Sequence, residues 1–300
     1  MRIILLNFLD QRSMKNIKYF LQFVCIIFLF GVFKIIGLRY SRILSGNIIT
    51  LLGPILRSEK IIIANLSKAF PGLSNIKKRK ILKKMWFNYG KIFAEYVFIK
   101  DFKNYPLSDE TISIENSSVI QKVKEQSRPV IFVSGHFNNF ELMAMQIEKS
   151  GIDLAAVYRP LNNKYLNPIM ENIRKKYICR KQIRKGISGT KELLLNFKKG
   201  SSIALMIDQR VSQGIKCNLF GHKALTTTIP AQFVKKFNAK IIPVYIERKN
   251  KDGFKITFEE PLEFSKDISI DLITAKLNNV LENMIIKNPE QWIWSHNRWK

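Results

Sequence analysis

The N-terminal part of the chain contains a long apolar run with almost no polar interruption. Residues 19–33 read YFLQFVCIIFLFGVF, in which Gln22 is the only clearly polar side chain. Continued to Leu38, the run would be about 30 Å long as a helix, enough to cross the hydrocarbon core of a bilayer. We therefore expect one membrane-spanning helix at about residues 19–38. A core helix of a soluble domain is the alternative interpretation.

A second apolar pattern, in residues 74–96, has the period of an amphipathic helix. Ser74 is a suitable N-cap for this helix, and lysines dominate the face opposite its apolar side. Such a helix either lies at the membrane interface or packs on the domain with a solvated cationic face, and the nearby apolar run favours the interface. The apolar positions are Leu82, Met85, Trp86, Tyr89, Phe93 and Tyr96.

From residue 129 onward, short β-rich runs alternate with helical stretches. This alternation predicts an α/β fold, a mixed sheet flanked by helices. We divide the chain into an N-terminal segment with the anchor, residues 1–42, and one folded domain, residues 43–300. The expected strands are Val130–Ser134, Leu154–Tyr158, Ile203–Ile207, Ile241–Ile246 and Phe254–Phe258. The expected helices are Phe140–Lys149, Asn167–Tyr177, Thr190–Lys198, Pro230–Phe237 and Leu272–Lys287.

Composition adds a strong positive charge to this picture. The chain has 50 Lys and Arg against 23 Asp and Glu, a formal net charge of +27. Such a charge favours an anionic partner: nucleic acid, an anionic membrane surface or an acidic carrier protein. The three cysteines are far apart and form no C-x-x-C pair, and the three histidines have no acidic cluster beside them. We therefore expect no metal site.

The segment PVIFVSGHFNNFELMAM, residues 129–145, carries the most informative chemistry. An apolar strand leads through Ser134 and Gly135 to His136, and a helix carrying Glu141 follows. His136 would then lie at the carboxyl end of a strand, where α/β sheets place ligand sites. An imidazole there is suited to removing a proton from a hydroxyl, and a helix N-terminus nearby would keep it neutral.

Other polar residues follow the next expected strands. Arg159 comes directly after the second strand, and Asp208 and Gln209 come at the end of the third. A cation at this edge would bind a phosphate or a developing oxyanion. Either Glu141 or Asp208 can orient the ring of His136, and Glu141 can pair with Arg159 instead. These alternatives remain open from the residues alone.

SGHFNNFE, residues 134–141, resembles the H-x4-[DE] block of glycerolipid-type acyltransferases, in particular the late acyltransferases of lipid A biosynthesis (lauroyl and myristoyl transferases). Four further segments resemble that family in the right order, so the resemblance covers most of the chain. They are ANLSKAFPGLS at 64–74, YRPLNNKYLNP at 158–168, the D-Q to T-T-T-x-P region at 204–245, and PEQWIWSHNRWK at 289–300.

The resemblance implies transfer of a fatty acyl chain from acyl carrier protein, or from a coenzyme A thioester, to a hydroxyl of a membrane lipid. For a lipid A precursor, that hydroxyl belongs to an attached 3-hydroxyacyl chain. His136 would be the general base with Glu141 in support, and no cofactor is needed because a thioester is already activated. The expected location is the inner membrane, with a single N-terminal span and the catalytic domain on the cytoplasmic side. The expected substrate-binding residues are Arg159, Asn162, Asp208 and Gln209.

The chain departs from the family pattern close to the histidine. Family members often have Gly and Trp where this chain has Asn138 and Phe140. A residue with a Cβ in place of glycine alters the backbone choices of the loop beside His136. The departures remove no proposed catalytic group.

Two other functions compete with acyl transfer to lipid A. One is acyl transfer to a glycerolipid or a lipoglycan, which uses the same chemistry. The other is a membrane-tethered basic protein that binds nucleic acid, but the sequence shows no reader helix, RNP-like aromatic pair or zinc module. The motifs G-x-G-x-x-G and G-x-S-x-G are also absent from the sequence. The motifs therefore favour an acyltransferase, and we expect no nucleic acid as a partner.

Overall fold

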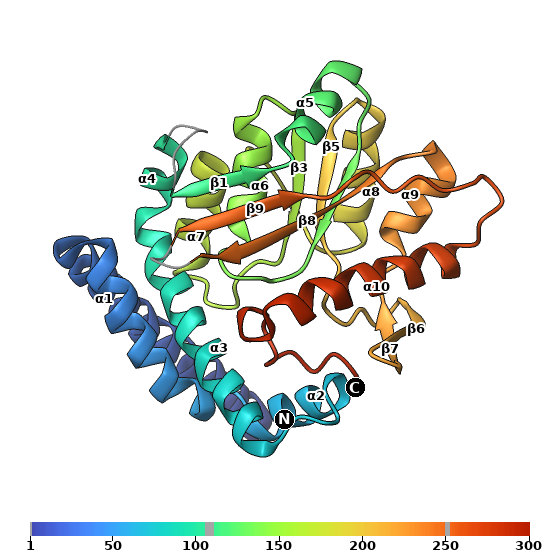
Figure 1. Ribbon diagram of the computed structural model, residues 1–300. Coiled ribbons are helices and arrows are strands. Elements are labelled where there is room, and N and C mark those ends of the chain that lie inside the picture. The colour runs from blue at the N-terminus through green and yellow to red at the C-terminus, as the bar shows by residue number, and fades with distance from the viewer. Residues whose placement is uncertain (1, 106–110, 250–252) are drawn as a thin grey trace.

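The computed structural model describes residues 2–105, 111–249 and 253–300, and its centre is a seven-stranded sheet (Figure 1). The strand order is β1-β9-β8-β2-β5-β3-β4. The strands from β8 to β4 are mutually parallel, and β9 runs antiparallel to β8. The predicted α/β fold with a mixed sheet is therefore confirmed. The strands are β1 (Ile112–Glu115), β2 (Ile131–Ser134), β3 (Leu154–Tyr158), β4 (Lys181–Arg184), β5 (Ser202–Met206), β8 (Ile241–Arg248) and β9 (Phe254–Phe258).

Helices cover both faces of the sheet, because the buried strands are apolar on both sides. In β2, Phe132 packs into one core while Ile131 and Val133 pack into the other. This alternation is the two-residue period of a strand. One face carries α4 (Ile99–Asn104), α5 (Ser117–Gln126) and α6 (Glu141–Lys149), and the other carries α8 (Ile187–Lys198), α9 (Ile229–Phe237) and α10 (Ile270–Lys287). α7 (Asn167–Ile173) continues into a π-helical turn, Arg174–Ile178.

Sequence periodicity finds the inner strands and misses the edges. All five predicted strands are present, within two residues at either end. The strands β1 and β4 were missed because they form the two edges of the sheet, where only part of each strand is buried and no apolar run is required. The hairpin of β6 (Ile215–Leu219) and β7 (His222–Thr226), which forms a separate two-stranded sheet, was also missed.

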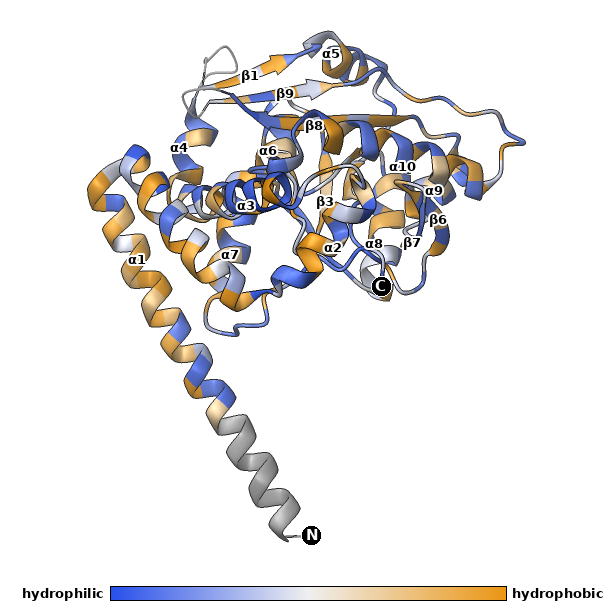
Figure 2. Cartoon of the chain, turned by 60° about the horizontal axis from the view of Figure 1, so that its bottom comes forward, coloured by the Kyte–Doolittle hydropathy of each residue, from blue (hydrophilic) through white to orange (hydrophobic). Residues whose placement is uncertain are grey.

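The helix α1 (Arg2–Leu56) projects from the domain (Figure 2). Its part Met14–Leu56 is long and apolar enough to cross a membrane, and it contains the predicted anchor. Many of its apolar side chains are exposed, with Phe28 at 70% and Ile35 at 86%. The helix bends at Gly37, whose φ of 76° is in the left-handed region that favours glycine.

Beyond the bend, α1 packs against α3 (Asn75–Glu95) at very short range. The hydroxyl of Ser45 donates a 2.6 Å hydrogen bond to the carbonyl of Gly90. A Cβ on Gly90 would lie 2.3 Å from the Ser45 carbonyl oxygen, so only glycine permits this approach. The two helices thus form one rigid pair.

The apolar face of α3 belongs to the core of the domain. Ser74 caps α3 as predicted, accepting a hydrogen bond from the backbone N–H of Lys77. Met85 and Trp86 are buried together with α2 (Glu59–Ala69), α10 and the tryptophans of the C-terminal segment. The expectation that this face lies at the membrane interface is therefore wrong for Leu82, Met85 and Trp86, which the domain itself buries, whereas Tyr89 is 41% exposed.

Candidate active site

The loop that follows β2 places His136 at the carboxyl edge of the sheet. Its side chain is partly buried, with 19% of its surface exposed to solvent. Asn138, two residues on, has a φ of 44°, a left-handed conformation that asparagine tolerates better than most residues. Its side-chain amide donates to the carbonyl of Ile246 and to Oε1 of Gln291. The loop accommodates asparagine at this position because the residue is left-handed and its amide is bound.

Asp208 contacts the ring of His136. Its Oδ1 lies 2.7 Å from Nδ1 of His136, and its Oδ2 accepts a 2.8 Å hydrogen bond from the backbone N–H of His136. The two residues meet because β2 and β5 are adjacent parallel strands, and each residue follows the carboxyl end of its strand. The carboxylate therefore fixes both the ring and the loop.

Trp292 completes the environment of Asp208. Its indole N–H donates a 2.8 Å hydrogen bond to Oδ2 of Asp208, and only 2% of the residue is exposed. Trp292 and the other tryptophans of the terminal motif are buried in the core of the domain. The contact to Asp208 was missed, and the only sequence signal for it is the terminal Q-W-x-W block.

The ionisation of the pair follows from burial and proximity. Burial of the His136 ring lowers its pKa, but the Asp208 carboxylate outweighs burial, so the pKa of His136 is raised above its ordinary value. Burial raises the pKa of Asp208, yet His136 and the hydrogen bond from Trp292 bring that pKa down to about 2. The nearby carboxylate thus opposes the effect of the helix N-terminus, which was expected to favour the neutral imidazole.

Glu141 lies at the first turn of α6. Its Oε1 accepts a 2.8 Å hydrogen bond from Nε of Arg174 and another from the hydroxyl of Tyr96. In the described part of the chain, no hydrogen bond or ion pair joins Glu141 to His136 or to Arg159. Both expected partners of Glu141 are thus replaced by Arg174.

The other candidate residues differ in how close they come to His136. Nε2 of Gln209 lies 3.4 Å from Nε2 of His136. With Nδ1 of the ring donating to Asp208, the free lone pair of Nε2 points towards this amide. Arg159 and Asn162 are exposed near the end of β3, and the structure gives neither a hydrogen bond to His136.

The chemistry of this site is that of a base and its orienting acid. In the described ranges, no group of three or more His, Cys, Asp or Glu side chains is arranged to hold a metal ion. A partly exposed imidazole with a buried carboxylate behind it can accept a proton at Nε2 and return it.

Comparisons with known proteins give the family. A family model described as bacterial lipid A biosynthesis acyltransferase matches residues 9–300. The chain is 26% identical over 253 residues to the lipid A biosynthesis lauroyltransferase of Escherichia coli (strain K12), covering 81% of this chain and 79% of the relative. It is 23% identical over 252 residues to the lipid A biosynthesis palmitoleoyltransferase of the same strain, covering 81% and 79%. The chain therefore belongs to the bacterial lipid A biosynthesis acyltransferase family and is an O-acyltransferase.

Proposed function

We propose that this protein transfers a fatty acyl chain from a thioester to a hydroxyl of a lipid A precursor, with His136 as the general base. The observation that carries the proposal is the contact of Nδ1 of His136 with Asp208, in a ring that is still 19% exposed. The family model and the names of the relatives support lipid A as the acceptor. The hydroxyl of a 3-hydroxyacyl chain is the acceptor group we propose.

The proposed reaction is direct transfer between the two substrates. Nδ1–H donates a hydrogen bond to Oδ1 of Asp208, so Nε2 carries the lone pair and takes the hydroxyl proton of the acceptor. The acceptor oxygen attacks the thioester carbonyl and forms a tetrahedral oxyanion. The C–S bond then breaks, the ester is formed, and the imidazolium returns its proton to the departing thiolate. The enzyme is restored without a covalent intermediate because a thioester is already activated.

Other residues of the carboxyl edge support this chemistry in the proposal. Arg159 is the cation that meets the oxyanion or a substrate phosphate, and Asn162 and Gln209 contact the substrate. Glu141 acts as a positioning residue, since its bond to Arg174 ties the start of α6 to the π-helical turn behind it. These roles rest on position in the fold and on the family motifs.

We also propose a location for the protein and a source of the acyl chain. With α1 as the anchor, the catalytic domain lies on the cytoplasmic side of the inner membrane, where acyl carrier protein or acyl-coenzyme A supplies the acyl chain. The net charge of +27 suits an acidic carrier protein and an anionic lipid surface. A glycerolipid or lipoglycan acceptor would use the same base and the same donor.

The test is an assay of the full-length protein with an acyl carrier protein thioester and a lipid A precursor, followed by mass spectrometry of the lipid. We expect the mass of one acyl chain to be added, and we expect His136→Ala to lower kcat by roughly 10²–10⁴-fold. His222→Ala is the matched control, because His222 is an exposed residue at the start of β7. Full activity of His136→Ala would refute the base, and addition only to a glycerolipid would refute the acceptor.

A further inference from the structure

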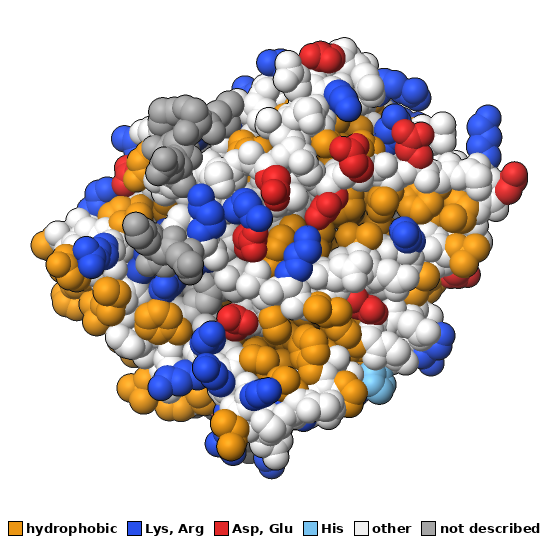
Figure 3. Space-filling view, viewed as in Figure 1, with side chains coloured by type: hydrophobic (Ala, Val, Ile, Leu, Met, Phe, Trp, Pro, Cys, Tyr) orange, Lys and Arg blue, Asp and Glu red, His pale blue; other side chains and the backbone are white. Residues whose placement is uncertain are grey.

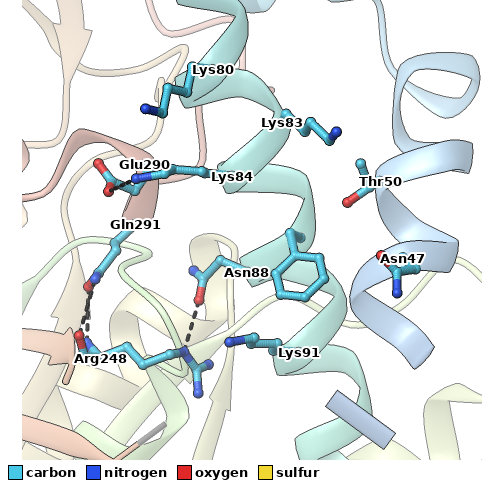
Figure 4. A pocket seen from close by; sticks show the side chains of 11 residues that line it. Asn47, Thr50, Lys80, Lys83, Lys84, Asn88, Lys91, Arg248, Glu290 and Gln291 are labelled. Carbon is cyan, nitrogen blue, oxygen red and sulfur yellow. Dashed lines mark hydrogen bonds and ion pairs between the residues drawn. The ribbon is translucent and has the colours of Figure 1, made fainter. Parts of the chain in front are cut away.

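A basic pocket opens between α1, α3 and the carboxyl end of β8, apart from the His136 ring (Figure 4). Its volume is about 440 Å³. The wall formed by α3 is cationic, while α1 contributes Asn47 and Thr50, whose amide and hydroxyl are polar but uncharged. The proposed mechanism uses none of these side chains, so it does not account for the cationic lining of the pocket.

Four lysines of α3 contribute most of the cationic lining. Lys80, Lys83, Lys84 and Lys91 all line the pocket, and Figure 4 shows Lys83 extending from α3 towards Thr50 of α1 while Lys80 extends in the opposite direction. Lys84 pairs with Glu290 at 3.2 Å. Among the described residues, no carboxylate lies in ion-pair range of Lys80 or Lys83. The pocket therefore has two exposed ammonium groups that no protein carboxylate neutralises.

The framework of the pocket is rigid. Arg248, which lines it, is held by Glu95 at 2.7 Å and by Oδ1 of Asn88 at 3.1 Å. The close contact of Gly90 with the backbone of Ser45 fixes the distance between the two helices. Of the cations that line the pocket, Arg248 is therefore held in place before an anion arrives, which lowers its entropic cost of binding.

Two apolar side chains of α1 are exposed close along the helix to the pocket-lining Thr50. Leu51 is 73% exposed and Ile55 is 78% exposed, close along the helix to Thr50 in the pocket wall. Figure 3 shows Lys and Arg side chains gathered over α3 beside apolar side chains of α1. A ligand with an anionic headgroup and apolar chains matches both surfaces at once, whereas an acidic protein surface matches only the lysines.

The pocket is also joined to the catalytic loop. Gln291 lines the pocket, and its Oε1 accepts hydrogen bonds from the side chain of Asn138 and the backbone N–H of Arg248. The next residue, Trp292, donates to Asp208. A headgroup in the pocket would thus lie against the segment that holds the catalytic carboxylate.

We propose that this basic pocket binds a phosphate group of the anionic lipid acceptor, with Lys80 and Lys83 as the principal ligands. The identification of the lipid as the acceptor rests on the proposed function, while phosphate binding does not. The site anchors the headgroup while a hydroxyl of an acyl chain reaches His136. Phosphate is the fitting chemistry because its charge and its oxygens accept several ammonium donors together.

Binding is tested first without any transfer reaction. The full-length protein in neutral detergent is titrated calorimetrically with dihexanoyl phosphatidic acid, dihexanoyl phosphatidylcholine and inorganic phosphate. We expect phosphatidic acid to bind more tightly than inorganic phosphate and phosphatidylcholine not to bind. Lys80→Gln/Lys83→Gln should weaken the binding of phosphatidic acid by on the order of tenfold or more. The control Lys60→Gln/Lys77→Gln removes the same charge from exposed residues outside the pocket.

Two calorimetric results would overturn the proposal. Equal affinity of the pocket variant, the control variant and the unmodified protein for phosphatidic acid would show that the pocket is not the site. Binding of inorganic phosphate as tight as that of phosphatidic acid would show a free-anion site rather than a lipid site. Thermal unfolding of each variant shows whether it is folded.

Kinetics then tests the acceptor. We expect Lys80→Gln/Lys83→Gln to raise KM for the lipid A precursor by roughly tenfold, far more than it changes kcat or KM for the thioester donor. An increase confined to KM for acyl carrier protein would overturn the lipid assignment in favour of carrier docking. If the unmodified protein transfers no acyl chain, the proposed function fails, and calorimetry still decides whether the pocket binds a lipid phosphate.

Discussion

Oδ1 of Asp208 lies 2.7 Å from Nδ1 of His136, although 72 residues separate the two in the sequence. The contact supports Asp208 as the carboxylate that orients the proposed base, while Glu141, only five residues from His136, binds Arg174. The H-x4-[DE] motif thus points to Glu141 as the acidic partner of His136, whereas the geometry points to Asp208.

Replacing Asp208 by Asn should reduce kcat by at least about 10²-fold. Asparagine can present its NH2 group to Nδ1, which would place the ring proton on Nε2 and remove the lone pair that accepts the substrate proton. The change is nearly isosteric, so the fold should persist. The measurement is the steady-state rate with circular dichroism as the fold control, and a variant with normal kcat would contradict the assigned role.

The acid limb of the pH–rate profile should lie above the ordinary imidazole pKa of about 6.5. The base must be neutral to act, and the pKa of His136 is raised by Asp208. In Asp208→Asn the opposing burial would dominate, so the residual activity should titrate at lower pH. Profiles of kcat/KM for both proteins test this, and coincident limbs would exclude His136 as the titrating group.

The pKa shifts of His136 and Asp208 also make the stability of the protein depend on pH, in opposite directions for the two groups. The raised pKa of His136 contributes stability that is complete below the unfolded pKa of about 6.5 and is lost as pH rises through the folded value. The lowered pKa of Asp208 contributes stability that is present above its unfolded pKa and is lost as pH falls through about 2. Thermal unfolding against pH should therefore show the midpoint falling at both ends, and Asp208→Asn should flatten both limbs.

Removing the buried cation at Arg174 should destabilise the protein by about 3–5 kcal/mol. Arg174 and Glu141 are both buried, so Arg174→Met leaves the Glu141 carboxylate without its partner. The control is Glu259→Gln, which breaks the exposed pair with Lys287 and should cost less than about 1 kcal/mol. Denaturant unfolding in detergent measures both, and equal effects would contradict a structural role for the buried pair.

Gly90→Ala should separate α1 from α3 and cost about 1–3 kcal/mol by overpacking. The added Cβ would lie 2.3 Å from the carbonyl oxygen of Ser45, and backbone atoms cannot yield locally. Gly31→Ala in α1 is the matched control, because a Cβ there meets nothing within 4 Å. The midpoint of thermal unfolding should fall for Gly90→Ala alone, and a tolerated Gly90→Ala would show that the helices are not tightly held.

The sequence predicts the inner sheet and the position of His136 because buried strands require apolar runs and glycine marks the turn. It does not show that β2 and β5 are neighbours, since β3 lies between them in the chain. That adjacency is decided by packing of the whole domain, so the choice between Glu141 and Asp208 was open. The partner of Trp292 was hidden for the same reason, because a tryptophan in sequence does not show where its N–H points.

The hydrogen bond from Trp292 to Asp208 has a consequence for biosynthesis. Trp292 is 84 residues downstream of Asp208, so the ribosome makes it several seconds later at typical elongation rates. During that interval α1, made first, has already emerged and can insert into the bilayer. The nascent chain is therefore expected to present α1, a candidate membrane span, before Asp208 receives the hydrogen bond of the Trp292 indole.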